Sequence, residues 1–133
     1  MAFPVEEKYI IAAEDELGIE FPECFRFKMI EENGGEIVTE EDDWQLFPFF
    51  DQSDPKRISR TCNHIVLEND NVKASEHFPT EGIAIASNGC GDFLLFLPSL
   101  QDRKILGSEI FLWTHENGII EKIAETIEEL NDN

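Results

Sequence analysis

Residues 87–92, Ser-Asn-Gly-Cys-Gly-Asp, form a glycine-rich segment directly before an apolar run. Such a segment is compatible with two functional sites, a phosphate-binding loop or a turn that holds a cysteine nucleophile. It is also compatible with a structural hairpin between two strands. A phosphate-binding loop needs a helix after its glycines, because the amides at a helix N-terminus bind the anion. The residues that follow here, 93–97, are typical of a strand, and no Gly-Lys-Ser or Gly-Lys-Thr is present. The pattern therefore disfavours a nucleotide site.

A cysteine nucleophile needs a neighbouring base and a positively charged pocket that stabilises the thiolate. The chain has three histidines, but none stands in a recognisable catalytic signature with Cys90: His64, His77 and His115. We therefore expect Cys90 to be a small buried residue and the segment to be a hairpin, with Asn88-Gly89 supplying positive φ in the turn. Gly91 would then relieve a bulge or a close contact beside Asp92.

The spacing of the candidate ligands does not support metal or carboxylate-pair chemistry. Cys62-x-His64 lacks the second pair of ligands that zinc requires. Residues 40–43, Glu-Glu-Asp-Asp, lack the alternating carboxylates and the distal Glu of a calcium loop. Pairs of carboxylates, as glycosidases use them, arise by chance in a chain this acidic. The sequence thus assigns no catalytic, cofactor-binding or metal-binding residue, and we do not expect an enzyme.

Acidic residues dominate the charge, because 29 Asp and Glu against 10 Lys and Arg leave a formal net charge of −19. Their distribution is uneven: the span from Glu31 to Asp54 contains nine acids and no Lys or Arg. A charge run usually marks a solvated face that keeps a protein soluble, but solubility needs far less charge than this. Such a field repels nucleic acid and anionic membranes and accelerates association with basic partners.

Length and composition favour a single domain over residues 1–133 that lies in the cytoplasm. The 133 residues are 41% hydrophobic and include 11 Phe, enough to build a buried core. No apolar run approaches the length of a membrane span, and the first ten residues lack the pattern of a secretory signal. The three cysteines are an odd number without disulfide spacing, which favours reduced thiols. The oligomeric state stays open.

Periodicity predicts helices near both ends of the chain and one between them. The first covers residues 5–17 and ends at Gly18, and the second begins near Pro22 and ends at residues 33–35, Asn-Gly-Gly. Apolar residues on two of its faces, including Phe27, predict that the second helix is well buried. A third helix is expected within residues 59–75, with Ser59 or Thr61 as its cap, and a fourth over residues 117–130.

Short apolar runs bounded by turn residues predict the strands: residues 36–38, 44–49, 83–86, 93–97 and 110–113. Pro48 indicates that the second strand is an edge strand or is interrupted there. Residues 50–60 are polar and are expected to be irregular. The order of the elements predicts an α+β domain with a mainly antiparallel sheet packed by helices. Trp44 and Trp113 are expected in the core or at its rim, and Trp44 is also a candidate partly exposed anchor for a partner.

Several segments together resemble the SUKH superfamily, which includes bacterial immunity proteins against polymorphic toxins and a fungal regulator of cell-wall synthesis. The similar segments are ELGIEFPECFRFKMIEENGGEI, the LFPF strand, IAIASNGCGDFLLFLP and IFLWTHENGIIEKIA, from about Ile10 to Leu130. The resemblance implies a compact α+β fold with a twisted sheet, no catalysis, and binding of a toxin domain such as a nuclease or a nucleic-acid deaminase. It also implies that Gly89, Gly91 and Asp92 support the fold. Residues 51–74 match only loosely.

Charge and resemblance together predict an immunity protein that blocks a basic toxin domain, because a nuclease carries Lys and Arg to hold phosphates. The alternative is a non-catalytic regulatory or scaffold domain with a non-toxin partner. Binding to nucleic acid or to membranes is not expected. The predicted partner contacts follow the acidic span, with a second group beyond it: Glu40, Glu41, Asp42, Asp43 and Trp44 first, then Asp51, Asp54, Glu68 and Asp70.

Overall fold

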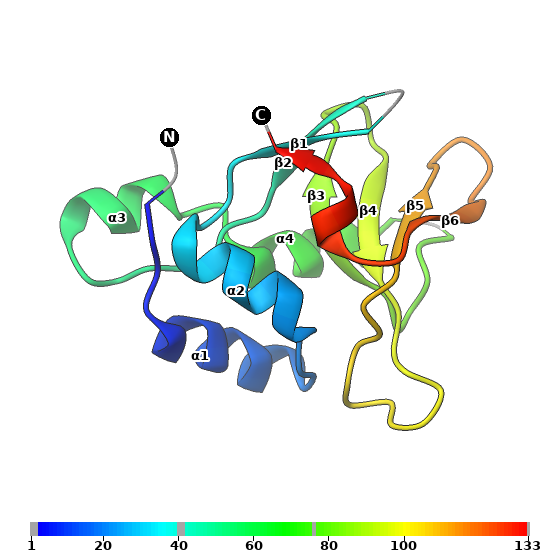
Figure 1. Ribbon diagram of the computed structural model, residues 1–133. Helices are drawn as coiled ribbons and strands as arrows, with labels where there is room; N and C mark the ends of the chain where they lie inside the picture. The colour runs from blue at the N-terminus through cyan, green and yellow to red at the C-terminus, as the bar shows by residue number, and fades with distance from the viewer. Residues whose placement is uncertain (1–2, 40–41, 76, 133) are drawn as a thin grey trace.

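The computed structural model describes residues 3–39, 42–75 and 77–132, and in these ranges the chain forms helices packed on one curved antiparallel sheet (Figure 1). The helices are α1 (Glu7–Leu17), α2 (Glu23–Glu31), α3 (Pro55–Arg60), α4 (Ile65–Val72) and the short 3₁₀ helix η1 (Ile127–Glu129). The strands are β1 (Glu36–Val38), β2 (Asp43–Leu46), β3 (Ile83–Ser87), β4 (Phe93–Phe96), β5 (Ile110–Trp113), β6 (Ile120–Ala124) and β7 (Asn131–Asp132). The predicted α+β class with an antiparallel sheet is confirmed.

The sheet runs in the order β6-β5-β4-β3-β2-β1-β7, so its two outermost strands are consecutive in sequence. Seven flat strands would separate those edges by roughly 29 Å, at about 4.8 Å per strand. The linker from Ala124 to Asn131 can span at most about 25 Å when fully extended, and η1 shortens it further. The sheet must therefore curl toward itself, and Figure 1 shows the C-terminal segment crossing from β6 to β1.

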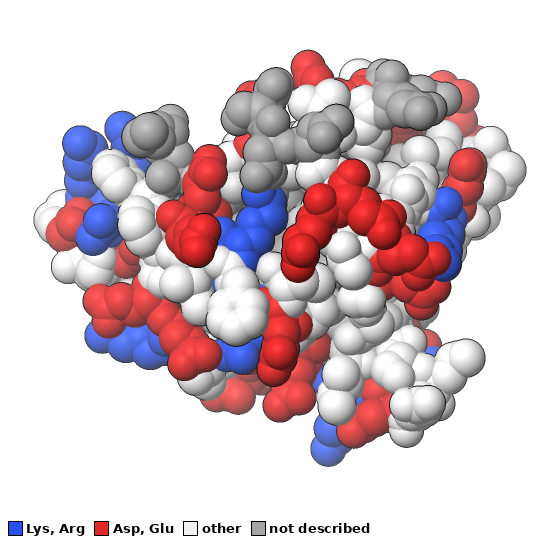
Figure 2. Space-filling model, viewed as in Figure 1, with Lys and Arg blue, Asp and Glu red and all other residues white. Residues whose placement is uncertain are grey.

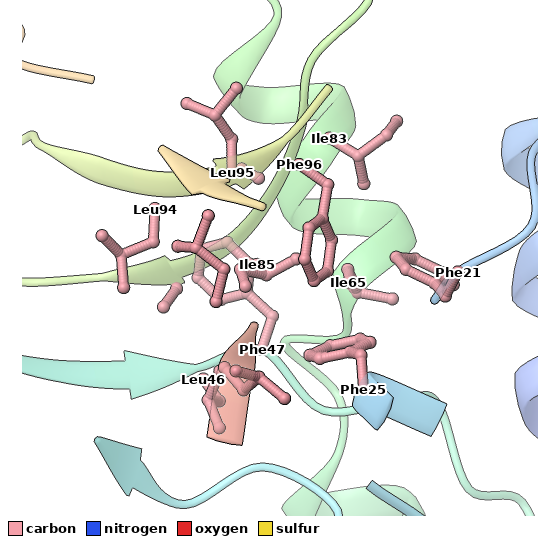
Figure 3. Close-up of a cluster of buried hydrophobic side chains, with 14 of the residues drawn as sticks. Phe21, Phe25, Leu46, Phe47, Ile65, Ile83, Ile85, Leu94, Leu95 and Phe96 are labelled. Carbon is pink, nitrogen blue, oxygen red and sulfur yellow. The ribbon is translucent and has the colours of Figure 1, made fainter. Parts of the chain in front are cut away.

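The core fills both faces of the central strands. On β4, Phe96 packs edge-on against Phe25 of α2 with ring centroids 5.3 Å apart, while Phe93, on the opposite face, stacks on Trp113 at 6.0 Å. Figure 3 shows Phe25 and Phe96 pointing toward each other beside Ile65 of α4. Side chains alternate between the two faces of a strand, so burial on both faces produces the continuous apolar runs seen in the sequence.

The beginning and the middle of the chain follow the predicted pattern closely. Helix α1 ends at Gly18, whose φ of 73° is left-handed, and α2 ends before Gly34 and Gly35, which also have positive φ. Strand β2 ends at Leu46, so the predicted strand of residues 44–49 is interrupted before Pro48, as expected. One prediction for α2 is wrong: Phe27 is 65% exposed, because it lies opposite the side of the helix on which Phe25 and Met29 are buried.

Residues 50–75 differ from the prediction of an irregular stretch followed by one helix. The structure has two helices, and their caps are Asp54 and His64, not Ser59 or Thr61. Pro55 occupies the first turn of α3, where its missing N–H costs nothing. Thr61 instead ends α3, with its hydroxyl donating to the carbonyl oxygen of Arg57 at 2.7 Å.

The C-terminal helix predicted over residues 117–130 is also wrong. Gly118 adopts a φ of 69° in a turn, and the chain then pairs with β5 as strand β6. The apolar residues that fitted a helix have unequal environments, since Ile120 is 39% exposed whereas Ile127 is 1% exposed. Pairing with the otherwise open edge of β5 satisfies the backbone groups and overrides the local helical pattern.

Candidate binding groove

An open groove of about 950 Å³ lies between the β1–β2 hairpin and the segment containing α3 and α4. Among the described residues, its charged lining consists of five acids and two bases: Glu32, Glu36, Asp43, Asp51, Glu68, Arg57 and Arg60. The turn after β3, residues 87–89, lines it as well. The groove thus gathers part of the acidic span that the sequence singled out.

A buried asparagine holds the segment after α2 against the irregular segment that follows β2. The side-chain amide of Asn33 donates to the carbonyl oxygen of Phe49 at 2.8 Å and accepts from the Phe49 N–H at 2.8 Å. Gly34 and Gly35 then turn the chain into β1 with φ of 109° and 85°, which side chains other than glycine rarely adopt. This turn places Glu36 on the groove.

The helical wall of the groove is fixed by side-chain hydrogen bonds. Asp54 caps α3 by accepting from the Arg57 N–H at 2.9 Å. Asp51 is 3% exposed and accepts from the N–H and the hydroxyl of Ser53 at 3.0 and 2.6 Å, and the Arg57 Nε lies 3.9 Å from its carboxylate. Asp51 therefore stabilises the wall, and little of its carboxylate is available to a partner.

Helix α4 is capped by His64, whose Nδ1 accepts from the Leu67 N–H at 3.4 Å. The imidazole stacks on Phe50 with ring centroids 4.6 Å apart. Burial lowers the pKa of His64 below 6.5, although Asp70 and Glu68 oppose that shift. A lowered pKa favours the neutral imidazole, which is the form that can accept the hydrogen bond at the cap.

Basic residues gather at the far end of the groove, over α3. Around the ring of Phe3 lie the Lys56 Nζ at 5.6 Å, the Arg57 Cζ at 5.0 Å and the Arg60 Cζ at 4.8 Å from the centroid. Figure 2 shows Lys and Arg at the left of the molecule, where Figure 1 labels α3, while Asp and Glu are spread over much of the rest of that face. The groove therefore has a basic end and a more acidic body.

The glycine-rich segment is the β3–β4 hairpin, as predicted, but of Asn88 and Gly89 only Gly89 has the expected positive φ. Gly89 has a φ of 81°, and Asn88 contributes its side chain, donating to the Asp42 Oδ2 and the Asp92 Oδ2, each at 3.1 Å. The Asp92 Oδ1 accepts from the backbone N–H of His115 at 3.0 Å and lies 2.7 Å from its Nδ1. Burial alone would raise the pKa of Asp92, but the hydrogen bonds from His115 and Asn88 outweigh it and lower that pKa.

Gly91 makes the close contact expected beside Asp92. A Cβ atom on Gly91 would stand 3.1 Å from the His115 Nδ1, and the residue has a φ of 102°. The expected bulge lies elsewhere, in β3 between Ala84 and Ala86. The prediction that Cys90 is buried is wrong, because it is exposed at the tip of the hairpin.

The predicted contact residues divide into three groups. Asp43, Asp51, Glu68 and Trp44 line the groove, and Asp42 adjoins it through Asn88. Asp54 and Asp70 are exposed outside the groove lining. Glu40 and Glu41 lie outside the described residues.

Trp44 is a core residue, 1% exposed, and its Nε1 donates to the Thr39 hydroxyl at 3.1 Å. The expectation of a core tryptophan is confirmed and that of a partly exposed anchor is wrong. Glu32, Glu36 and Arg60 also line the groove, although the sequence analysis does not predict them as contacts. Glu32 and Glu36 belong to the acidic span of residues 31–54, which is the sequence signal that could have identified them. Arg60 lies outside that span, and only the fold places it in the same groove.

Among the residues that the structure describes, no three His, Cys, Asp or Glu side chains are grouped as metal ligands. The described helices also include none that is long and apolar enough to cross a bilayer.

Residues 4–133 match the sequence model of the SMI1 / KNR4 family (SUKH-1). The chain belongs to this family. The resemblance to the SUKH superfamily is thereby confirmed over nearly the whole sequence. No curated protein and no solved structure matched the chain. Membership of SUKH-1 supports an immunity or regulatory role with a protein partner, and members of the family are generally non-catalytic.

Proposed function

We propose that this SUKH-1 protein is a cytoplasmic immunity protein of one domain, residues 1–133, which binds a basic toxin domain and blocks it without catalysis. The observation that carries the proposal is the body of the groove, where Glu36, Asp43 and Glu68 come together from β1, β2 and α4. A nuclease or a nucleic-acid deaminase uses Lys and Arg side chains to bind phosphates. Carboxylates held in a groove can form ion pairs with those side chains and so keep them from the nucleic acid.

The charges of the groove favour a basic partner once its internal ion pair is taken into account. Arg57 lies against the buried Asp51 carboxylate, so these two largely offset each other. Four acids and one base of the lining remain: the exposed Glu32, Glu36 and Asp43, the half-buried Glu68, and Arg60 at the basic end. Exposed charges of this kind chiefly accelerate association and set its dependence on salt.

A regulatory or scaffold role with a non-toxin partner is the second candidate. The basic end of the groove, where Lys56, Arg57 and Arg60 surround Phe3, favours it because a partner of mixed charge would match both ends. Such an interface would depend less on salt, since a partner of mixed charge has little net charge and its long-range attraction to the acidic chain is small.

The test uses the C-terminal domain of a toxin encoded beside this gene, with binding measured at about 50 and about 500 mM salt. One variant removes three groove charges: Glu36→Gln, Asp43→Asn and Glu68→Gln. The matched control removes three exposed acids outside the groove: Asp15→Asn, Glu16→Gln and Glu121→Gln. Both variants change the net charge equally, so only position distinguishes them.

We expect the groove variant to associate roughly 10-fold more slowly at low salt while the control stays within about twofold. Cells that produce the toxin should be protected less by the groove variant than by the control variant. Equal effects of the two variants would show that total charge matters and the groove does not. Absence of binding by the wild-type protein at either salt would refute that partner and favour the regulatory role.

A further inference from the structure

Helix α2 presents an aromatic side chain to solvent between two carboxylates. Glu23, Phe27 and Glu31 are each four residues apart, so they lie along one side of the helix. All three are exposed, and Phe27 is 65% exposed, whereas Phe25 and Met29 on the opposite side are 0% exposed. Phe27 is neither in the core cluster nor among the partly buried residues packed on it. We call Glu23, Phe27 and Glu31 the α2 stripe.

The surroundings of the α2 stripe add further negative charge. The 3₁₀ helix η1 packs against α2 and carries Glu128 and Glu129, both exposed. Of the two bases on α2, Arg26 is already engaged by α1, with its NH2 3.1 Å from the Glu7 Oε2 and its Nε 3.6 Å from the Glu14 Oε2. The second, Lys28, is half-buried and has a partner within the chain. Figure 2 shows Asp and Glu on this face over α2 and over the segment that contains η1.

We propose that the α2 stripe is a second contact surface for the basic partner, with Phe27 as its anchor. A flat aromatic ring between carboxylates suits an arginine, because the guanidinium can stack on the ring while its N–H groups pair with Glu23 or Glu31. A second copy of this chain is a poor occupant, since the acidic stripe would face another strongly acidic surface on a protein of charge −19.

The α2 stripe adjoins the groove through the backbone. Glu31 is its last residue, and the next residue, Glu32, already lines the groove. One basic domain can therefore contact both surfaces, with the groove accelerating association and the ring of Phe27 prolonging the complex. The identity of the partner as a toxin rests on the proposed function, but the location of the surface does not.

The experiment compares two exposed apolar side chains in the full chain. Phe27→Ala removes the anchor, and Leu100→Ala is the matched control, because Leu100 is 96% exposed on the loop between β4 and β5. Binding to the toxin domain encoded beside the gene is measured by association and dissociation rates. In parallel, an acetylated and amidated hexa-arginine peptide is titrated into the wild type and both variants, followed by amide and aromatic NMR shifts.

We expect Phe27→Ala to weaken binding of the domain by roughly 10- to 30-fold, mainly through faster dissociation, and Leu100→Ala to change it by less than about twofold. With the peptide, the largest shifts should fall on α2 and the Phe27 ring, and Phe27→Ala should reduce them. The double variant Glu23→Gln, Glu31→Gln should weaken binding of the peptide. Its unfolding temperature should match that of the wild type, which would show that the fold is intact.

Two results would overturn the inference. One is binding of the toxin domain with equal affinity by wild type and Phe27→Ala, which would leave the immunity role standing and remove the α2 stripe from it. The other is a peptide titration whose shifts spare α2. If the wild type does not bind the domain at all, that partner is refuted, and the peptide titration alone decides whether the α2 stripe binds arginine side chains.

Discussion

Removing the side-chain amide of Asn69 is expected to destabilise the wall of the groove more than any surface change on the same helix. Asn69 is 0% exposed, and its Nδ2 donates to the carbonyl oxygens of Ile65 at 2.8 Å and Ala84 at 2.9 Å. Its Oδ1 accepts from the Ala84 N–H at 2.8 Å. Strand β2 pairs with β3 only at Ser87 and Ala86, so the amide of Asn69 takes the place of a strand partner for Ala84.

The magnitude follows from the groups left without a partner. Asn69→Ala orphans the buried N–H and carbonyl of Ala84, and each unsatisfied buried group costs about 1–3 kcal/mol. We expect a loss of roughly 3 kcal/mol in the free energy of unfolding, a large part of the 5–15 kcal/mol typical of a domain. For a chain of this length the unfolding temperature should fall by roughly 10 °C.

Urea unfolding followed by circular dichroism measures this loss as a lower midpoint with an unchanged slope. The control is Asn71→Ala on the same helix, where the side chain is exposed and the change should stay within about 0.5 kcal/mol. Asn69→Asp tests the donors separately, because it keeps an acceptor and places a carboxylate against the Ala84 carbonyl. If Asn69→Ala and Asn71→Ala unfold at the same urea concentration, the reasoning about Ala84 is refuted.

Two further predictions concern the hairpin and the helix cap. Gly91→Ala should cost about 1–3 kcal/mol, because its φ of 102° is strained for alanine and its Cβ would press on His115. Gly89→Ala, whose Cβ would meet no atom within 4 Å, should cost less, and equal urea midpoints would contradict the close contact. The folded state binds the proton on His64 less tightly than the unfolded chain does, so stability should be complete above pH 6.5 and decline as pH falls below it. His64→Asn keeps an acceptor at the cap and should flatten this decline; an identical pH dependence would assign it to other groups.

The local sequence pattern correctly predicts the turns, because their conformation depends on residues that are close together along the chain. Gly18 ends α1, and Gly34 and Gly35 turn the chain after α2, because positive φ is inexpensive for glycine, and this preference needs no tertiary contact. The hairpin at residues 87–92 could also be predicted from the sequence, since Gly89 and Gly91 lie between two apolar runs. The family resemblance rests on the same segments, which explains why it could be stated from the sequence.

The tertiary structure decided the C-terminal segment and the groove. Residues 117–130 carry a helical spacing of apolar side chains, yet residues 120–124 form a strand because the edge of β5 offers hydrogen-bond partners that no local pattern reveals. Burial of Trp44 likewise depends on an element that is distant in sequence, because its strand β2 pairs with β3.

The sequence by itself determined the acidic charge, the turns, most strands and the family, because composition and local backbone preferences fix them. The fold alone placed Glu36, Asp43 and Glu68 around one groove and left Phe27 facing solvent. Which charges share a surface, and which apolar side chains are left over, depends on how elements distant along the chain pack together.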